Sequence, residues 1–185
     1  MKKLLLLAVF LFLLTCSQAL AADNAVPEGT IVTAIEIAGN HNISKEAISE
    51  PILTRIGDPL SSEKLRGDAK AIYALGYFSD IKVTLKKFAN GAKIIFTVFE
   101  NAMITKININ GVTAYSTDEV MSLITVKEGE VLDYRKLQND IKTIDALYKD
   151  DGYLLAKVID VATDEKTGIL TFQIIEGIIE AITIQ

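Results

Sequence analysis

Residues 71–83 read AIYALGYFSDIKV, and this stretch joins a helix to a strand. An apolar helix face ends at Gly76, and beyond the glycine apolar residues alternate with polar ones, as in a half-buried strand. Glycine adopts a positive φ at no steric cost, so Gly76 is predicted to turn the chain where the helix ends. The sequence therefore predicts a tight helix-to-strand joint here.

The same joint occurs again at residues 145–159, which read DALYKDDGYLLAKVI. Ala-Leu and Gly-Tyr both recur, with four more residues between them. Four residues make about one turn of helix, so the second helix is predicted to be one turn longer. A register shared along both copies indicates a tandem repeat. With an offset of 72 and, beyond the extra turn, of 76, the matched pairs include Gly39 and Gly111, Ile52 and Ile124, Asp68 and Asp140, Gly76 and Gly152, Val83 and Ile159, Phe96 and Phe172, and Glu100 and Glu176.

The patterns within one copy run strand, helix, helix, strand, strand. Apolar residues lie on one face of the predicted strands and charged residues on the other, so helices can cover only one face of the sheet. The fold class is predicted as α+β, with tandem βααββ units that each form a three-stranded mixed sheet with two helices on one face. The third strand of each unit is the most continuously apolar and is predicted at the centre. Four glycines are predicted to form structural turns: Gly39, Gly76, Gly111 and Gly152.

The predicted domains follow from the repeat. Unit 1 covers residues 31–101, and unit 2 covers residues 102–176. Residues 177–185 repeat the spacing of a first strand and are predicted to begin an incomplete third unit, so the native protein is expected to continue, or the strand to pair elsewhere.

The first residues of the chain have the pattern of an export signal. Residues 1–21 contain two lysines, an apolar run and a final Ala-Leu-Ala, the three parts of a cleavable export signal. The apolar run is too short to span a membrane. Residues 22–30 are predicted as a short leader. A rival interpretation makes Cys16 the acylated residue of a lipoprotein, although no small residue precedes it.

Composition excludes several classes of function. Removal of the signal leaves 17 basic against 24 acidic residues, a net charge of −7, which argues against a nucleic-acid partner. His41 is the only histidine, and the only cysteine is lost with the signal. A histidine-based triad, a histidine or cysteine metal site and a disulfide are therefore excluded, and no phosphate-binding glycine loop occurs. We predict no catalytic residue, no metal and no cofactor, and hence a protein that is not an enzyme.

These features together resemble the POTRA (polypeptide-transport-associated) domain. The resemblance rests on the βααββ order, the Gly-Asn at residues 39–40, the Gly-Asp turn at residues 57–58, the joint at residues 74–83 and the closing Val-Phe-Glu at residues 98–100. It covers nearly all of the mature chain. The chain is similar to the periplasmic arm of outer-membrane barrel-assembly proteins of the BamA and TamA type.

The resemblance implies a periplasmic docking arm, associated with the outer membrane, for assembly and insertion of outer-membrane β-barrel proteins. The implied partners are unfolded outer-membrane proteins, assembly-complex lipoproteins or chaperones, and a membrane β-barrel that this sequence does not contain. Two alternatives stay open. The chain can be the POTRA part of a two-partner secretion transporter, or a structural spacer that binds no client.

The candidate binding site is the edge of the second strand of each unit. If the third strand is central, the second has one unpaired side, to which an extended segment can add through main-chain hydrogen bonds. Lysines on this strand suit an edge. The predicted binding residues are Ile81, Lys82, Val83, Thr84, Leu85 and Lys86 in unit 1 and Val158, Ile159, Asp160 and Val161 in unit 2.

Overall fold

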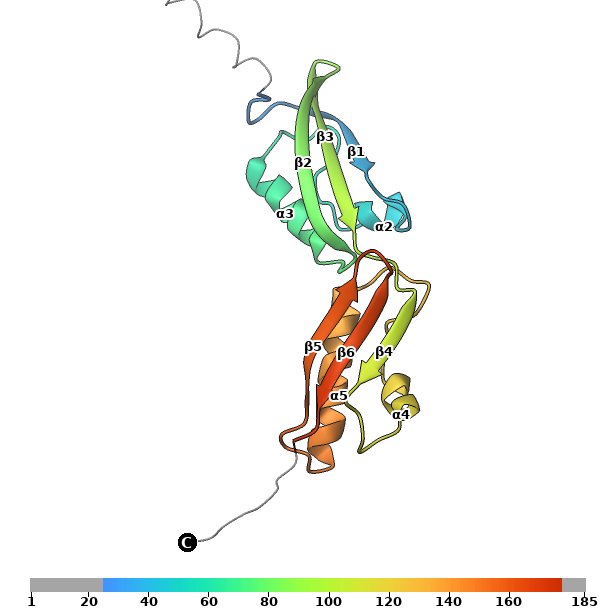
Figure 1. The fold of residues 1–185 in the computed structure, drawn as a ribbon. Coiled ribbons are helices and arrows are strands. Elements are labelled where there is room, and N and C mark those ends of the chain that lie inside the picture. The colour runs from blue at the N-terminus through green and yellow to red at the C-terminus, as the bar shows by residue number, and fades with distance from the viewer. Residues whose placement is uncertain (1–24, 178–185) are drawn as a thin grey trace, which may run out of the picture.

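A computed structural model describes residues 25–177, which form two units stacked end to end (Figure 1). The predicted export signal and residues 178–185 of the predicted third unit lie outside the described residues. Unit 1 consists of β1 (Val32–Ala38), α2 (Lys45–Ser49), α3 (Ser62–Tyr73), β2 (Phe78–Phe88) and β3 (Gly91–Glu100). Unit 2 consists of β4 (Lys106–Asn110), α4 (Thr117–Ser122), α5 (Tyr134–Asp150), β5 (Lys157–Asp164) and β6 (Ile169–Ile175).

Both units have the same sheet topology. The strand orders are β1-β3-β2 and β4-β6-β5. The first strand pairs with the central strand in parallel, and the second pairs with it antiparallel, so both sheets are mixed. Helices cover one face of each sheet and leave the other open (Figure 1). The predicted α+β class, and the central position of the third strand, are confirmed.

Side-chain caps explain where the helices begin. Ser44 accepts from the Ala47 N–H at the start of α2, and Asp133 accepts from two amides at the start of α5. Ser116 and Glu119 form a reciprocal capping box at α4. α5 has 17 residues against 12 in α3, so the extra turn expected from the spacing of the two joints is present.

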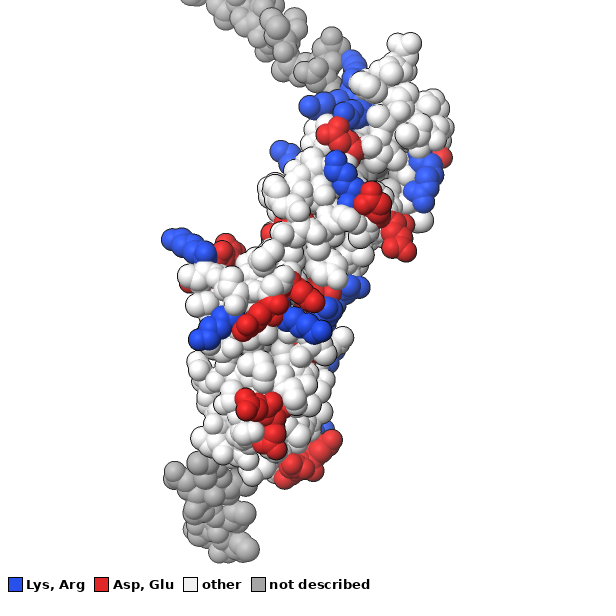
Figure 2. Space-filling view, turned by 90° about the vertical axis from the view of Figure 1, so that its right-hand side faces the viewer, with Lys and Arg blue, Asp and Glu red and all other residues white. Residues whose placement is uncertain are grey.

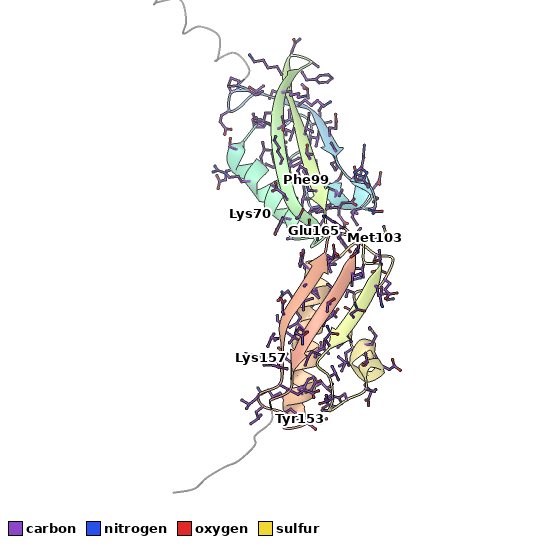
Figure 3. All side chains as sticks on the ribbon, in the orientation of Figure 1. Lys70, Phe99, Met103, Tyr153, Lys157 and Glu165 are labelled. Atoms are coloured by element: carbon purple, nitrogen blue, oxygen red, sulfur yellow. The ribbon has the colours of Figure 1, made fainter. Side chains whose placement is uncertain are left out.

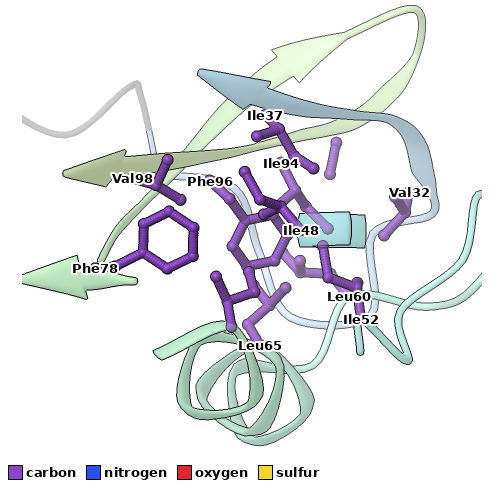
Figure 4. Close-up of a cluster of buried hydrophobic side chains, with 12 residues drawn as sticks. Val32, Ile37, Ile48, Ile52, Leu60, Leu65, Phe78, Ile94, Phe96 and Val98 are labelled. Carbon is purple, nitrogen blue, oxygen red and sulfur yellow. The ribbon is translucent and has the colours of Figure 1, made fainter. Parts of the chain in front are cut away.

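Each unit has its own hydrophobic core between helices and sheet. In unit 1 the side chain of Phe96 lies near its centre and Phe78 lies at one end beside Val98, and both rings are almost fully buried (Figure 4). In unit 2 Phe172 and Tyr148 have the corresponding role. Side chains of the alternate register, such as Lys82, are exposed on the open face. The two-face pattern of the strands therefore decides which side the helices cover.

Two buried carboxylates hold the loop after the first helix of each unit. Asp68 is 1% exposed and accepts from the N–H groups of Leu53 (2.7 Å) and Thr54 (3.2 Å), and also from the Thr54 hydroxyl. Its repeat partner Asp140, also 1% exposed, accepts from the Val126 N–H at 3.1 Å. A carboxylate can be buried in this way because hydrogen bonds replace its water. The matched aspartates of the repeat thus have matched structural roles.

The two units meet at the joint that the sequence emphasises. The Asn101 side-chain amide is 9% exposed and donates to the carbonyls of Gly76 (2.9 Å) and Leu132 (2.8 Å). The Tyr134 N–H at the start of α5 also donates to the Gly76 carbonyl, at 3.0 Å. Gly76 has a φ of +88°, the left-handed conformation with which a glycine typically ends a helix. One turn of unit 1 is therefore an anchor for unit 2.

The repeat alignment is wrong in one stretch. It matches Val83 with Ile159, but Val83 pairs with Phe96, and Phe172, the repeat partner of Phe96, pairs with Val161. The register of β5 shifts between Val158 and Asp160, so Ile159 is an extra residue in the strand. Ile81 and Val158 face the matched residues Val98 and Ile174, so the shift is already one residue before this bulge and two residues after it. A shift of two residues preserves the alternation, and for this reason the sequence alignment passed over it.

Candidate peptide-binding edges

The direction of the backbone amides decides whether an edge can bind a further strand. The Ala92 N–H donates to the Ile31 carbonyl at 2.8 Å, so Ala92 points toward β1. Peptide groups alternate along a strand, and Ile94 and Phe96 therefore also point toward β1. Their partners on β2, Leu85 and Val83, point in the opposite direction, away from the sheet.

The predicted binding residues of unit 1 accordingly divide into two sets. Ile81, Val83 and Leu85 present their amides to the open edge, while their side chains pack partly against the core. The Ile81 N–H is already accepted by the Asp80 carboxylate at 2.8 Å. Lys82, Thr84 and Lys86 direct their amides into the ladder with β3, because they face Thr97, Ile95 and Lys93. The open amides of this edge are thus those of Val83 and Leu85.

The corresponding edge in unit 2 is partly occupied. The Val158 N–H, which points outward by the same alternation, is accepted by the Asp145 carboxylate of α5 at 2.8 Å. Ile159 is the bulge residue and is 50% exposed. Val161 faces Phe172 and directs its amide outward. The two predicted edges therefore differ in how much of their backbone is available.

A second edge, which the sequence analysis did not consider, lies along the first strand of each unit. In unit 2 the outward Ile107 N–H is accepted by the Glu128 side chain at 2.9 Å. In unit 1 the equivalent residue is Ile35, and position 56, which corresponds to Glu128, is isoleucine. A groove of about 620 Å³ lies beside β1 there. Its lining includes Ile35, Ile37, Lys45, Ile52, Arg55 and Ile56. The sequence shows this difference between the units as isoleucine at position 56 and glutamate at the equivalent position 128.

The carboxylates that end the two central strands are structural. Glu100 accepts from the amides of His41 (2.8 Å) and Ile43 (2.9 Å) and thereby closes the turn after β1. Glu176 closes the corresponding turn of unit 2, and accepts from Thr113 at 3.0 Å and from the Tyr148 hydroxyl at 2.7 Å. Partial burial alone would raise the pKa of Glu176, but these hydrogen bonds outweigh it and lower the pKa to about 2.

Tyr148, which donates to this second carboxylate, belongs to an aromatic cluster. Tyr115, Tyr148 and Tyr153 pack edge to face, with ring centroids 5.0 to 6.2 Å apart. The Tyr115 hydroxyl donates to Asp151 at 2.6 Å, and this hydrogen bond raises the pKa of Tyr115 to about 12. Figure 3 places Tyr153 at the end of unit 2 that is far from the joint, and Met103 and Glu165 where the units meet. The hydrogen bond to Asp151 holds the pKa of Tyr115 above the ordinary value, and burial together with the hydrogen bond to Glu176 does the same for the pKa of Tyr148. A raised pKa disfavours a tyrosinate nucleophile, so we assign the cluster a packing role.

Among residues 25–177, no three histidine, cysteine or acidic side chains lie close enough together to hold a metal ion. The helices in that range are also too short or too polar to cross a membrane.

The arrangement defines a class of protein: two βααββ units in tandem, joined at a fixed turn and bordered by unpaired strand edges. The family model for POTRA, described as a surface antigen variable number repeat, matches residues 30–101 and 102–177. The chain belongs to the POTRA family.

Similar proteins agree with this assignment. The chain is 28% identical over 130 residues to the outer membrane protein assembly factor BamA of Nitratidesulfovibrio vulgaris (strain Hildenborough), covering 70% of this chain and 16% of that protein. The N-terminal domain of Omp85 from Thermosynechococcus elongatus is similar in structure, with a TM-score of 0.74 and 25% identity over 84% of this chain and 66% of that one. POTRA1-2 of Omp85 from Anabaena has the same fold, with a TM-score of 0.65 and 24% identity over 84% of this chain and all of that one (100%).

Proposed function

We propose that this chain is part of the periplasmic arm of an outer-membrane protein assembly factor. The proposal is supported by membership of the POTRA family and by similarity to a protein named as such a factor. The chain spans only 16% of that relative, so the activity and partners of a whole assembly factor are part of the proposal. The partners are unfolded outer-membrane proteins, assembly-complex lipoproteins or chaperones, and a membrane-embedded β-barrel.

The mechanism that we propose is strand addition at the free edge of β2. The observation that carries it is the outward direction of the Val83 and Leu85 amides. Main-chain hydrogen bonds give an affinity that depends little on side-chain identity, which suits clients of varied sequence. Each bond is worth about 1 kcal/mol net, so a short segment can also leave. Capture and release then need no chemical energy.

Unit 1 is the main capture site in this proposal. The outward Val158 amide of unit 2 is engaged by Asp145, which an incoming strand would have to displace. The exposed lysines Lys82 and Lys86 in unit 1 discourage self-pairing and favour acidic clients, whereas Asp160 makes the edge of unit 2 less basic. Client preference is therefore expected to differ between the units.

The test is Val83→Pro, which removes an outward amide while proline remains acceptable on an edge strand. The control is Val83→Ala, which also removes the valine side chain from its contact with the core but keeps the amide. If strand addition operates, a peptide from an outer-membrane β-strand binds the proline variant about fivefold more weakly than the alanine variant, the effect of one hydrogen bond worth about 1 kcal/mol. Circular dichroism establishes that both are folded. Equal affinities would favour the spacer, an alternative supported by the firm Asn101 joint.

A further inference from the structure

The outer edge of β1 in unit 1 is open where the same edge of unit 2 is closed. The two edges begin alike: the Val32 N–H donates to the Asp58 carbonyl at 2.9 Å, and the Ile104 N–H donates to the Glu130 carbonyl at 2.8 Å. Three residues further on they differ. Glu128 accepts from the Ile107 N–H in unit 2, whereas in unit 1 no described residue accepts from the equivalent Ile35 N–H.

The Ile35 amide points outward for the same geometric reason as that of Ile107. Both residues have the same register against the central strand, because Ile35 pairs with Ile94 and Ile107 pairs with Leu170. Ile94 directs its peptide groups toward β1, so Ile35 directs its own away from the sheet. A donor at this position is therefore available to a group that enters the groove.

The loop that could cover this donor carries an apolar residue instead. Ile56 occupies the position of Glu128 and is 66% exposed. Gly57 and Gly129, which follow them, have φ of +97° and +84° and make the same hydrogen bonds to Val32 and Ile104. Since the two loops share this glycine conformation and this hydrogen bond, we attribute the difference between the edges to the side chain at position 56 or 128.

The groove between β1, α2 and this loop has a floor and a charged rim. Ile52, 2% exposed, lies at its base, and the exposed Ile56 forms one wall. Lys45 and Arg55 line it as well. Arg55 donates through Nη1 to the carbonyls of Ile52 and Thr54, which leaves its remaining donors unpartnered among the described residues.

Charge and shape together indicate what the groove accepts. The only carboxylate that lines it, Glu36, forms an ion pair with Lys93 on the open face of the sheet. Figure 2 views this side of the molecule, where basic and acidic atoms alternate with broad uncharged areas over unit 1. The cations Lys45 and Arg55 therefore favour an occupant with negative charge, and the exposed Ile56 favours an apolar side chain next to it.

We propose that this groove binds an extended peptide segment of another protein, with an acceptor for the Ile35 N–H, an apolar residue against Ile56 and a carboxylate between Lys45 and Arg55. In unit 2 the side chain of Glu128 is a built-in substitute for such a ligand, and it keeps the equivalent edge closed. Unit 1 then has two strand-accepting edges, β1 and β2, and unit 2 is restricted at both. The inference extends the proposed function, because it assumes that unit 1 binds extended segments.

The test exchanges the two loop residues. The probe is a blocked peptide of alternating valine and threonine with one central glutamate, titrated while the backbone amide resonances are followed by NMR. In the parent protein we expect the Ile35 amide to shift. Ile56→Glu should weaken this binding at least about tenfold, whereas Ile56→Ala, which adds no carboxylate, should weaken it less. Glu128→Ile should create a new response at the Ile107 amide.

The outcomes separate this inference from the proposed function. Shifts confined to Val83 and Leu85, unaffected by Ile56→Glu, would overturn the β1 groove and leave capture on β2 intact. Shifts at Ile35 that persist in Val83→Pro would support the groove even if capture on β2 fails. A shift at Ile35 that follows protein concentration without peptide would identify a second copy as the occupant and would overturn the proposal. A glutamine-for-glutamate peptide that binds equally well would refute the role of the two cations.

Discussion

Replacement of Glu176 by glutamine should make the stability of unit 2 less dependent on pH. The carboxylate accepts from the amides of Thr113 and Ala114, and from the Tyr148 hydroxyl. Its pKa falls from 4.5 to about 2, which would stabilise the fold by about 3 kcal/mol without screening. Because Glu176 is only partly buried, we expect about 1–2 kcal/mol.

The direction of the pH effect follows from the sign of this pKa change. The pKa is lower in the folded state, so the stabilisation is fully present above 4.5 and is lost as the pH falls toward 2. Glu176→Gln should therefore cost about 1–2 kcal/mol near pH 7 and almost nothing near pH 2. At the lowest pH the Glu176 carboxyl of the parent protein is protonated and has the same charge as glutamine.

Urea unfolding, followed by circular dichroism at several pH values, measures the effect. Hydrogen exchange at the Thr113 and Ala114 amides gives a local readout and should become faster in the variant. The control is Glu165→Gln, which removes the same charge from an exposed side chain that makes no hydrogen bond to a described residue. A cost for Glu176→Gln that is the same at every pH, or no larger than that of the control, would refute the reasoning.

Three further comparisons test the glycine turns, the joint and the loop that Asp68 holds. Gly76→Ala should destabilise the protein more than Gly152→Ala in thermal melts. Both glycines have φ near +90° (+88° and +89°), where a residue with a Cβ costs about 1–2 kcal/mol. A Cβ at Gly76 would also lie 2.2 Å from an Asp133 oxygen, whereas one at Gly152 would meet open space, so equal losses of stability would contradict this prediction. Asn101→Ala removes two buried hydrogen bonds, of which the one to Leu132 joins the units, so small-angle scattering should show a broader distribution of unit orientations, and an unchanged profile would count against a fixed joint. Asp68→Ala leaves two backbone amides unpaired and should cost about 2–4 kcal/mol in urea unfolding, whereas a cost below about 0.5 kcal/mol would exclude a structural role.

Several features of the fold could be predicted because they depend on neighbouring residues. The apolar residues change from helical spacing before Gly76 to alternation after it, and this change predicts the helix and the strand that follows it. The repeat is visible because both units bury the same faces, so that Asp68 and Asp140 recur at a constant offset. The longer α5 follows from the four additional residues before Gly152. Each of these properties is local, or is copied from one unit to the other.

The candidate site could be predicted only in part. The sequence pointed to β2 as an edge, but not to which of its amides are open. That distinction depends on one hydrogen bond of Ala92, from which the direction of every second residue follows. The sequence alignment also missed the extra residue Ile159 in β5, because together with one more inserted residue before Lys157 it shifts the register by two, which preserves the alternation on which the alignment relies.

The sequence by itself determined the architecture: two α+β units in tandem and the position of the joint. Only the tertiary structure decided which edges are available. The Asp145 carboxylate reaches Val158 from a helix, and Glu128 reaches Ile107 from a loop. Both contacts join residues that are separated in sequence, and their formation depends on how the helix and the loop pack beside the sheet. Local periodicity carries no information about such contacts, and for this reason the open groove of unit 1 became visible only in the folded chain.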